Sequence, residues 1–337
     1  MQKSLTLFLL FVVILTACSP ANRKNRIKYT FETANKKLND GYYAEAVALY
    51  TQVLEKDNQI TDAYLNRGVA YYEMGKYVAA LADYNEVYRL KPDYEEVLFN
   101  RAYAYMELGR TDNALEDLNH LRMLYPDTAL IDVVEGLVMM NDLKYEQAIV
   151  SFTEALQRDP DNFDAYSNRG ISRYELGDYE AAAADLSQAL VIHQNEPYAL
   201  NSLALVLADR GQLQKADSLI QIAMTLVGGQ AYFINNAGYV QMLMGNYAQA
   251  DSLIRSSMKI DRQNPYAYLN QGKLYIQMDS LDQAVTSLSQ AIELDSSLLG
   301  SYPLLIDTYL RLGNQQLACE LYQTKAEQLE VENPCNK

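Results

Sequence analysis

Five asparagines whose amides could bind a polypeptide backbone recur at a fixed spacing along the chain. A side-chain amide both donates and accepts hydrogen bonds, so one asparagine can satisfy both ends of a peptide group in an extended segment. The five lie 34 residues apart, or twice that: Asn66, Asn100, Asn168, Asn236 and Asn270. This regularity predicts a ladder that binds an extended polypeptide. The alternative is that these amides only bond neighbouring parts of the protein itself.

Tyrosine recurs at a second position of the same 34-residue spacing. Nearer the N-terminus, acidic residues occupy that position. The tyrosines are Tyr198, Tyr232 and Tyr266, and the matching acids are Asp62, Glu96 and Asp164. A surface that changes from acidic to aromatic along the chain could select a partner. The alternative is that the tyrosines fill interfaces between elements.

An apolar group lies between the acidic and the aromatic positions. It comprises Leu130, Val133, Val134, Leu137 and Met140. A contiguous apolar patch that no neighbouring element covers is typical of a contact surface. The alternative is that local packing covers these five side chains.

Enzyme chemistry has little support in this sequence. The two histidines, His120 and His193, have no repeated acidic or cysteine partner. No phosphate-binding glycine loop, nucleophile elbow or metal-spaced cluster is present. The many acidic residues are expected on the solvent side of helices. We therefore predict a protein without catalytic residues, metal site or cofactor.

The elements that must position these residues form a repeat. Alanine marks every unit, at Ala46, Ala80, Ala114, Ala148, Ala182, Ala216, Ala250, Ala284 and Ala318. Glycine stands five residues before most of these alanines, with Leu143 and Asp279 in its place in two units. Each unit reads as a helical stretch, a turn and a second helical stretch. A helical hairpin cannot bury both faces alone, so the hairpins must stack.

The second unit carries a specific family pattern. Its positions are Tyr64, Gly68, Tyr71, Tyr77, Ala80, Tyr84 and Pro92. This order resembles the tetratricopeptide repeat (TPR), and the resemblance covers about nine tenths of the chain. It implies an all-α, right-handed superhelical solenoid of about nine helix-turn-helix units over residues 29–332, with a tail at 333–337. The units are expected to start near residues 27, 61, 95, 129, 163, 197, 231, 265 and 299.

The resemblance also implies where a partner binds. The first helix of each unit would line a concave groove, and the asparagines, tyrosines and apolar residues above occupy inward-facing positions of that helix. Family members that clamp a terminal carboxylate use basic residues at positions that carry Phe31, Glu96 and Asn100 here. We therefore do not expect that clamp.

The N-terminus predicts export and a lipid anchor. Leu5 to Leu15 is an apolar run too short to span a bilayer, so residues 1–17 read as a signal peptide. The ending at Cys18 looks like a bacterial lipobox, which implies cleavage before Cys18 and its modification with lipid such as palmitate. The alternative is an ordinary cleaved signal with a chance cysteine. Residues 18–28 are expected to form a basic linker near the membrane.

Charge excludes two classes of ligand for the array. The whole chain has a net charge of −15, whereas residues 29–337 combine 23 basic with 43 acidic residues. Such a surface repels nucleic acid and the membrane plane. A basic or neutral partner segment suits it better.

The other two cysteines could pair in an oxidising compartment if the last helix ended early, but we expect them to stay unpaired. If the last helix continued to about Val331, Cys335 would have to return about 18 Å through four residues that span at most about 14 Å. Cys319 is then a buried small residue and Cys335 a tail thiol.

These features together predict a membrane-anchored scaffold that faces the periplasm, similar to bacterial TPR lipoproteins. Its groove would bind an extended or helical segment of another envelope protein. The alternatives are a pilotin-like factor for assembly of an outer-membrane protein or appendage, and a glycan-binding lipoprotein that uses the three tyrosines.

Overall fold

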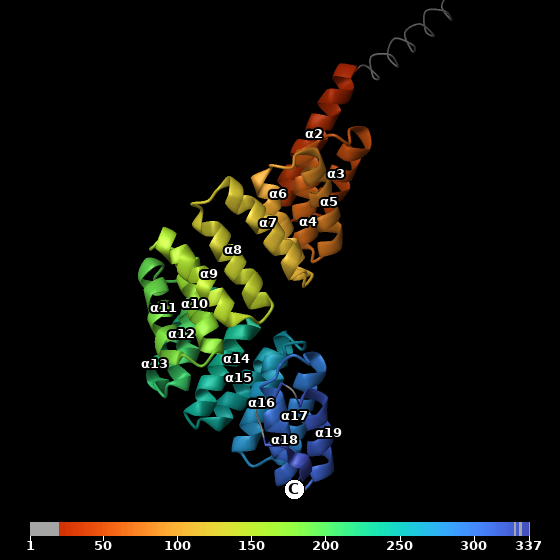
Figure 1. Ribbon diagram of the computed structural model, residues 1–337. Helices are drawn as coiled ribbons and strands as arrows, with labels where there is room; N and C mark the ends of the chain where they lie inside the picture. Colours follow the sequence, from red (N-terminus) through yellow and green to blue (C-terminus); the bar gives the residue numbers. More distant parts are fainter. Residues whose placement is uncertain (1–19, 327, 330–331, 337) are drawn as a thin grey trace, which may run out of the picture. The chain divides into compact units, whose positions relative to one another are not determined.

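The computed structural model describes residues 20–326, 328–329 and 332–336. Across these residues every regular element is helical, from α2 to α19 with one 3₁₀ helix, η1 (Figure 1). The predicted all-α fold is confirmed. The chain divides into two compact units, residues 1–160 and 161–337.

The first unit consists of four helical hairpins. They are α2 (Pro20–Asn39) with α3 (Tyr43–Lys56), α4 (Thr61–Glu73) with α5 (Tyr77–Leu90), α6 (Glu95–Glu107) with α7 (Thr111–Leu124), and α8 (Ala129–Asn141) with α9 (Tyr145–Arg158). Within this unit, α3 packs on α4, α5 on α6 and α7 on α8. The core therefore runs between hairpins as well as within them.

The second unit continues the same pattern with five hairpins. They are α10 (Phe163–Glu175) with α11 (Tyr179–Ile192), α12 (Pro197–Asp209) with α13 (Leu213–Val227), α14 (Ala231–Leu243) with α15 (Tyr247–Ile260), α16 (Pro265–Gln277) with α17 (Leu281–Leu294), and α18 (Ser301–Arg311) with α19 (Gln315–Lys325). Each first helix of this unit also contacts the next first helix, from α10 to α18. These helices form one wall, on which a binding site can be built.

A small residue is required where the two helices of a hairpin cross. A Cβ atom on Gly68 would lie 2.5 Å from Cε1 of Tyr84, and one on Gly136 would lie 2.5 Å from Cε1 of Phe152. The ring from the second helix thus occupies the space that a side chain on the first would need. This packing explains the small residue that the repeat keeps at this position.

The turn within each hairpin needs a left-handed backbone. Gly75 has φ of 68°, and Leu143 and Asp279, which replace glycine, have φ of 57° and 55°. The turn therefore keeps its geometry when glycine is absent. A side chain in this conformation costs roughly 1–2 kcal/mol.

The first helix begins earlier than the sequence pattern indicates. We expected a linker up to Lys28, but α2 starts at Pro20 and is continuous to Asn39. The segment contains Ala, Arg and Lys, which are good helix formers. The described part of the basic segment is therefore helical.

The prediction that Cys319 and Cys335 stay apart is wrong. α19 ends at Lys325, short of the expected Val331, and a disulfide joins the two cysteines with their Cα atoms 4.8 Å apart. The tail turns back because Leu329 is buried against Tyr302 and Ile306, on the face that the last hairpin leaves open. η1 (Pro334–Asn336) then carries Cys335 to α19.

The expected signal peptide and Cys18 lie outside the described residues. Among the helices that the structure does describe, none combines the length and the apolar character needed to cross a bilayer.

Candidate functional site

A cavity of about 780 Å³ lies on the wall of first helices in the second unit. α10, α12, α14 and α16 all contribute to its lining. Four of the predicted residues line this cavity: Tyr232, Asn236, Tyr266 and Asn270. The structure thus brings together two predicted tyrosines and two predicted asparagines. Asp209 and Lys273 also line it and were not singled out from the sequence.

Asp209 is the polar centre of one side of this cavity. Its Oδ2 accepts a hydrogen bond from the Tyr174 hydroxyl at 2.7 Å, and its Oδ1 accepts one from the Tyr239 hydroxyl at 2.6 Å. Burial raises the pKa of both tyrosines above their ordinary value, and the neighbouring carboxylate raises it further. The network ties α10, α12 and α14 together and uses both oxygens of Asp209.

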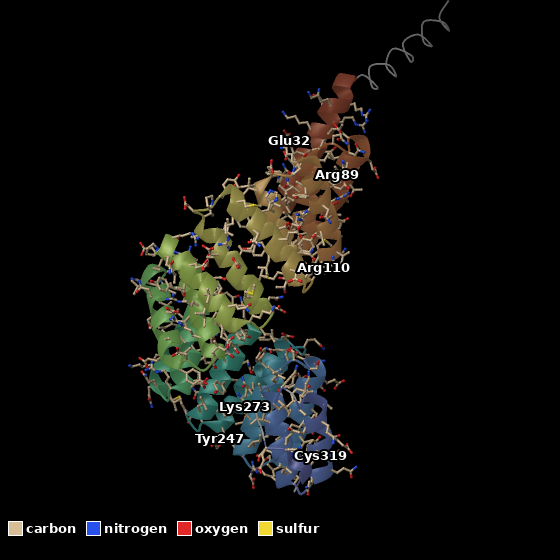
Figure 2. All side chains as sticks on the ribbon, in the orientation of Figure 1. Glu32, Arg89, Arg110, Tyr247, Lys273 and Cys319 are labelled. Atoms are coloured by element: carbon tan, nitrogen blue, oxygen red, sulfur yellow. A yellow bond between two sulfur atoms is a disulfide. The ribbon has the colours of Figure 1, made fainter. Side chains whose placement is uncertain are left out.

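Lys273 lies on α16, with its ammonium group 5.0 Å from the ring centre of Tyr239 (labelled in Figure 2). Burial lowers the pKa of Lys273 below its ordinary value, although the charge of Asp209 opposes the shift. Its ammonium group donates no hydrogen bond and forms no ion pair within the described part of the chain. A half-buried cation is thus left with one aromatic face and a distant carboxylate.

The five asparagines do not behave alike. Asn66 donates to Oδ1 of Asn35 on α2 at 3.1 Å, and Asn236 donates to Oδ1 of Asn201 on α12 at 3.1 Å. Asn66 and Asn236 thus bond to a neighbouring helix of the protein itself, which is the alternative interpretation of the asparagines.

The other three asparagines bond to no neighbouring helix among the described residues. Asn168 donates to the backbone oxygen of Asp164, one turn earlier in its own helix. Asn100 and Asn270 make no hydrogen bond to any described residue, and Asn270 is only 8% exposed. Asn270 therefore has an unpaired amide beside the cavity.

The three tyrosines remain accessible on the wall. Tyr198 is 53% exposed, Tyr232 42% and Tyr266 54%. Tyr198 does not line the cavity, and its ring packs against Phe233 at 5.2 Å between centroids. Tyr232 and Tyr266 are thus the aromatic platforms of the cavity.

The apolar patch of the first unit is largely covered. Leu130 is 48% exposed, whereas Val133 and Val134 are buried and Leu137 and Met140 are intermediate. The prediction of five exposed groove residues is therefore wrong for Val133 and Val134. Val134 lies in a core cluster with residues of α6, so its position faces the preceding hairpin. Asn66 and Asn236 occupy the same repeat position and bond to the preceding first helix in the same way.

Buried acids contradict the expectation that acidic residues follow solvent. Arg67 with Asp83, Arg101 with Asp117, and Arg169 with Asp185 form ion pairs between the two helices of three hairpins. All three aspartates are buried. The separation of 16 residues recurs in each pair and could have been found in the sequence.

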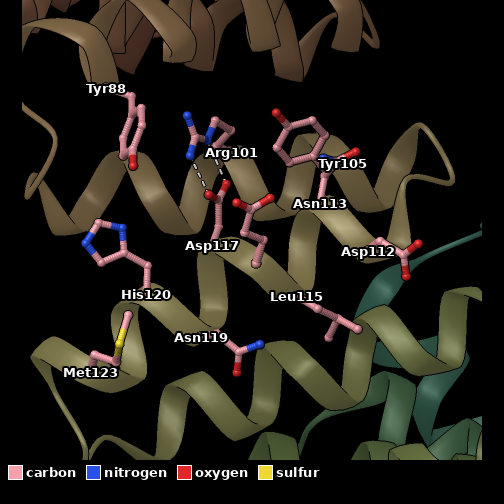
Figure 3. A pocket seen from close by; sticks show the side chains of 11 residues that line it. Tyr88, Arg101, Tyr105, Asp112, Asn113, Leu115, Asp117, Asn119, His120 and Met123 are labelled. Carbon is pink, nitrogen blue, oxygen red and sulfur yellow. Dashed lines mark hydrogen bonds and ion pairs between the residues drawn. The ribbon is translucent and has the colours of Figure 1, made fainter.

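One of these ion pairs borders a cavity of about 600 Å³ in the first unit. Figure 3 shows Arg101 between the rings of Tyr88 and Tyr105, with its hydrogen bonds to Asp117 drawn. The guanidinium carbon lies 3.9 Å from the ring centre of Tyr88. Arg101 is therefore fixed by three neighbours and already paired.

The two histidines contact an aspartate and aromatic rings. Nε2 of His120 lies 3.7 Å from Oδ1 of Asp93, and the ring of His193 stacks on Phe163 at 4.7 Å. No group of three or more His, Cys, Asp or Glu side chains within the described residues could hold a metal ion.

Comparisons with known proteins agree with this architecture. The family profile described as TPR repeat matches residues 70–109 and 144–177. Three profiles described as tetratricopeptide repeat match residues 96–128, 168–221 and 265–298. Together these ranges cover about half of the chain. A search of curated protein sequences found no match.

Several solved structures share the fold. A chain of the APC/C hetero-tetramer Cut9–Hcn1 is similar with a TM-score of 0.61 and 18% identity, over 79% of this chain and 52% of that one. The human IFIT1 dimer with m7Gppp-AAAA gives 0.58 and 20%, over 78% and 67%. PilW, a widely conserved type IV pilus biogenesis factor, gives 0.54 and 23%, over 62% and 97%.

At these identities the structural similarities show the fold alone, and the chain spans only about half the length of the Cut9–Hcn1 chain. The family profiles match the same hairpins that the structure contains, with the same 34-residue repeat. The chain belongs to the tetratricopeptide repeat family.

Proposed function

We propose that this protein is a lipid-anchored scaffold of the bacterial cell envelope, which binds an extended segment of another envelope protein on its wall of first helices. Membership of the repeat family supports a protein-interaction scaffold. The observation that carries the proposal is the 780 Å³ cavity of the second unit. Exposed aromatic rings and polar groups without partners meet there, as a peptide site requires.

The proposed location rests on three features of the chain. The ending at Cys18 resembles a lipobox, and Arg23, Lys24 and Arg26 follow it. The Cys319–Cys335 disulfide suits an oxidising compartment such as the periplasm. We assign the anchor to the outer membrane, facing the periplasm, and we assign no catalytic role to the array.

Affinity capture with paired variants tests the binding proposal. Envelope proteins held by the purified array would be compared for the wild type, the double variant Tyr232→Ala/Tyr266→Ala and the control Tyr29→Ala. Tyr29 is 73% exposed on α2, away from the cavity residues in sequence. We expect one partner to be lost only with the double variant. Equal retention by all three proteins would place binding elsewhere.

Assembly of an appendage is a second candidate, because PilW is similar over 97% of its own length. Its test is the identity of the captured partner, which would then be a pilus or secretin component. Glycan binding is a third, and it rests on the exposed rings of Tyr232 and Tyr266. A saturable response to sugar at millimolar concentration would favour it over a protein partner.

A further inference from the structure

The cavity of the second unit contains a cation and an amide that form no hydrogen bond or ion pair with the described residues. Lys273 and Asn270 lie three residues apart on α16, so their side chains share one face of that helix. Both line the cavity. A half-buried charge is costly unless it is paired, and the Asn270 amide makes no hydrogen bond to a described residue. Both groups are donors that lack an acceptor.

Neither of the two carboxylates that line the cavity forms an ion pair with Lys273. Both oxygens of Asp209 accept from the hydroxyls of Tyr174 and Tyr239. Glu175, at the end of α10, also lines the cavity and forms no ion pair within the described chain. Desolvation raises the pKa of Glu175, and no basic side chain neighbours it closely enough to reverse that shift. The cavity therefore keeps an unpaired cation although two acids line it.

We propose that Lys273 and Asn270 bind the side-chain carboxylate of an Asp or Glu residue in the partner segment. The inference rests on the proposed function and names the residue of the partner that enters this cavity. One ammonium group and one amide suit a single carboxylate. Asp209 and Glu175 repel a ligand of higher negative charge, such as a phosphate, more strongly than a single carboxylate.

The rest of the segment is expected to be neutral or basic, because residues 29–337 carry 43 acidic against 23 basic residues. Tyr232 and Tyr266 offer exposed rings beside the carboxylate site for a neighbouring apolar side chain. An extended segment that crosses α14 and α16 continues past the cavity. A side-chain carboxylate therefore fits better than a chain terminus.

Small probes distinguish the sources of a carboxylate. NMR signals of the Lys273 side chain, assigned with Lys273→Gln, would be followed in titrations of the full protein. N-acetylglutamate α-amide carries only a side-chain carboxylate, N-acetylglutamine α-amide is its neutral counterpart, and N-acetylalanine carries only a terminal carboxylate. We expect a saturable shift with the glutamate probe that is at least about tenfold weaker with the glutamine probe. Equal shifts, or no shift, overturn the proposal, and stronger binding of N-acetylalanine reassigns the site to a chain terminus.

Variants of the full protein connect the site to the native partner. Lys273→Gln should lower partner capture by about tenfold, whereas Lys215→Gln, which removes an exposed lysine of α13, should not. If the wild type captures a partner through Tyr232 and Tyr266 and Lys273→Gln captures it equally, the carboxylate site fails while the proposed function stands. If the wild type captures none, the proposed function fails independently of the titrations.

Thermal unfolding separates a binding lysine from a structural one. Lys273→Met removes a half-buried charge without a partner, so its melting temperature should equal or exceed that of the wild type. A clear fall in melting temperature would show that Lys273 stabilises the fold, and it would overturn its assignment to a ligand.

Discussion

Ion pairs between an arginine and a buried aspartate lie inside several hairpins. Arg101 and Asp117 pair between α6 and α7, and Nε of Arg101 lies 2.7 Å from Oδ2 of Asp117. Both side chains are nearly buried. Breaking such a pair is costly because it leaves one charge buried alone. The pairs therefore fix how the two helices of a hairpin meet.

The first prediction concerns this buried pair. Asp117→Ala should lower the free energy of opening α6 and α7 by about 3 kcal/mol, because Arg101 loses its carboxylate. Hydrogen exchange of the amides in these two helices measures that energy. Asp112→Ala, at an exposed acid of α7, is the matched control and should leave exchange unchanged. Similar exchange in both variants would contradict the argument.

The second prediction concerns the left-handed turn at Leu143. Its φ of 57° is unfavourable for a side chain, and the leucine is 58% exposed. Leu143→Gly should therefore stabilise the protein against urea by about 1 kcal/mol. Leu176→Gly, in the same kind of turn but at φ of −85°, should destabilise it instead. Loss of stability in Leu143→Gly would show that this turn is not strained.

The third prediction concerns pH. The pKa of Lys273 is lowered in the folded protein, so the unfolded chain binds more protons between that pKa and the ordinary value of 10.5. The contribution of Lys273 to the free energy of unfolding must then rise with pH between its lowered pKa and 10.5. The stability difference between Lys273→Met and the wild type should be largest at neutral pH and shrink as pH approaches 10.5. A constant difference in urea titrations at several pH values would contradict the shift.

At the scale of elements, the sequence predicts hairpins better than their contacts. The alanine and glycine spacing predicts helices that turn at Gly75 and at Leu143 alike, because the turn depends on the local backbone. The end of α19 could not be predicted in this way. The segment after Lys325 contains good helix formers, and it turns back because Leu329 is buried against the last hairpin and Cys335 is bonded to Cys319.

The candidate site was predictable only in part for the same reason. Tyr232 and Tyr266 were found from the register, and both line the cavity. The register could not separate Asn66, which bonds to Asn35, from Asn270, which has no partner in the described chain. That difference depends on which side chain the preceding first helix presents. Lys273 occurs once at its repeat position and carries no periodic signal.

The fourth prediction concerns the tail that covers the last hairpin. Replacing Cys319 and Cys335 with serine should lower the opening free energy of α18 and α19 by about 2–3 kcal/mol, given a sequence separation of 16 residues. Reduction of the wild type should have the same effect on amide exchange. The amides of α10 and α11 serve as the internal control. Unchanged exchange in α19 would mean that burial of Leu329 alone holds the tail.

At the scale of the whole molecule, the proposed function requires a lipid anchor at Cys18 as well as the wall of first helices. Cys18→Ser should release the protein from membranes, because the negative charge of the array is repelled by the membrane surface and the short basic segment alone holds it weakly. Fractionation of cells that express the variant measures this. Lys215→Gln, at an exposed lysine of α13, is a control that should stay with the membrane. A membrane-bound Cys18→Ser protein would remove the anchor from the account.

The most direct test of the central claim is photocrosslinking in the native envelope from a probe at Tyr232. The comparison is a probe at Ser252, an exposed residue on the second helix α15 of the same hairpin. We predict that Tyr232 captures one discrete partner and that Ser252 does not. Capture from Ser252 alone, or from neither position, would contradict binding on the wall of first helices.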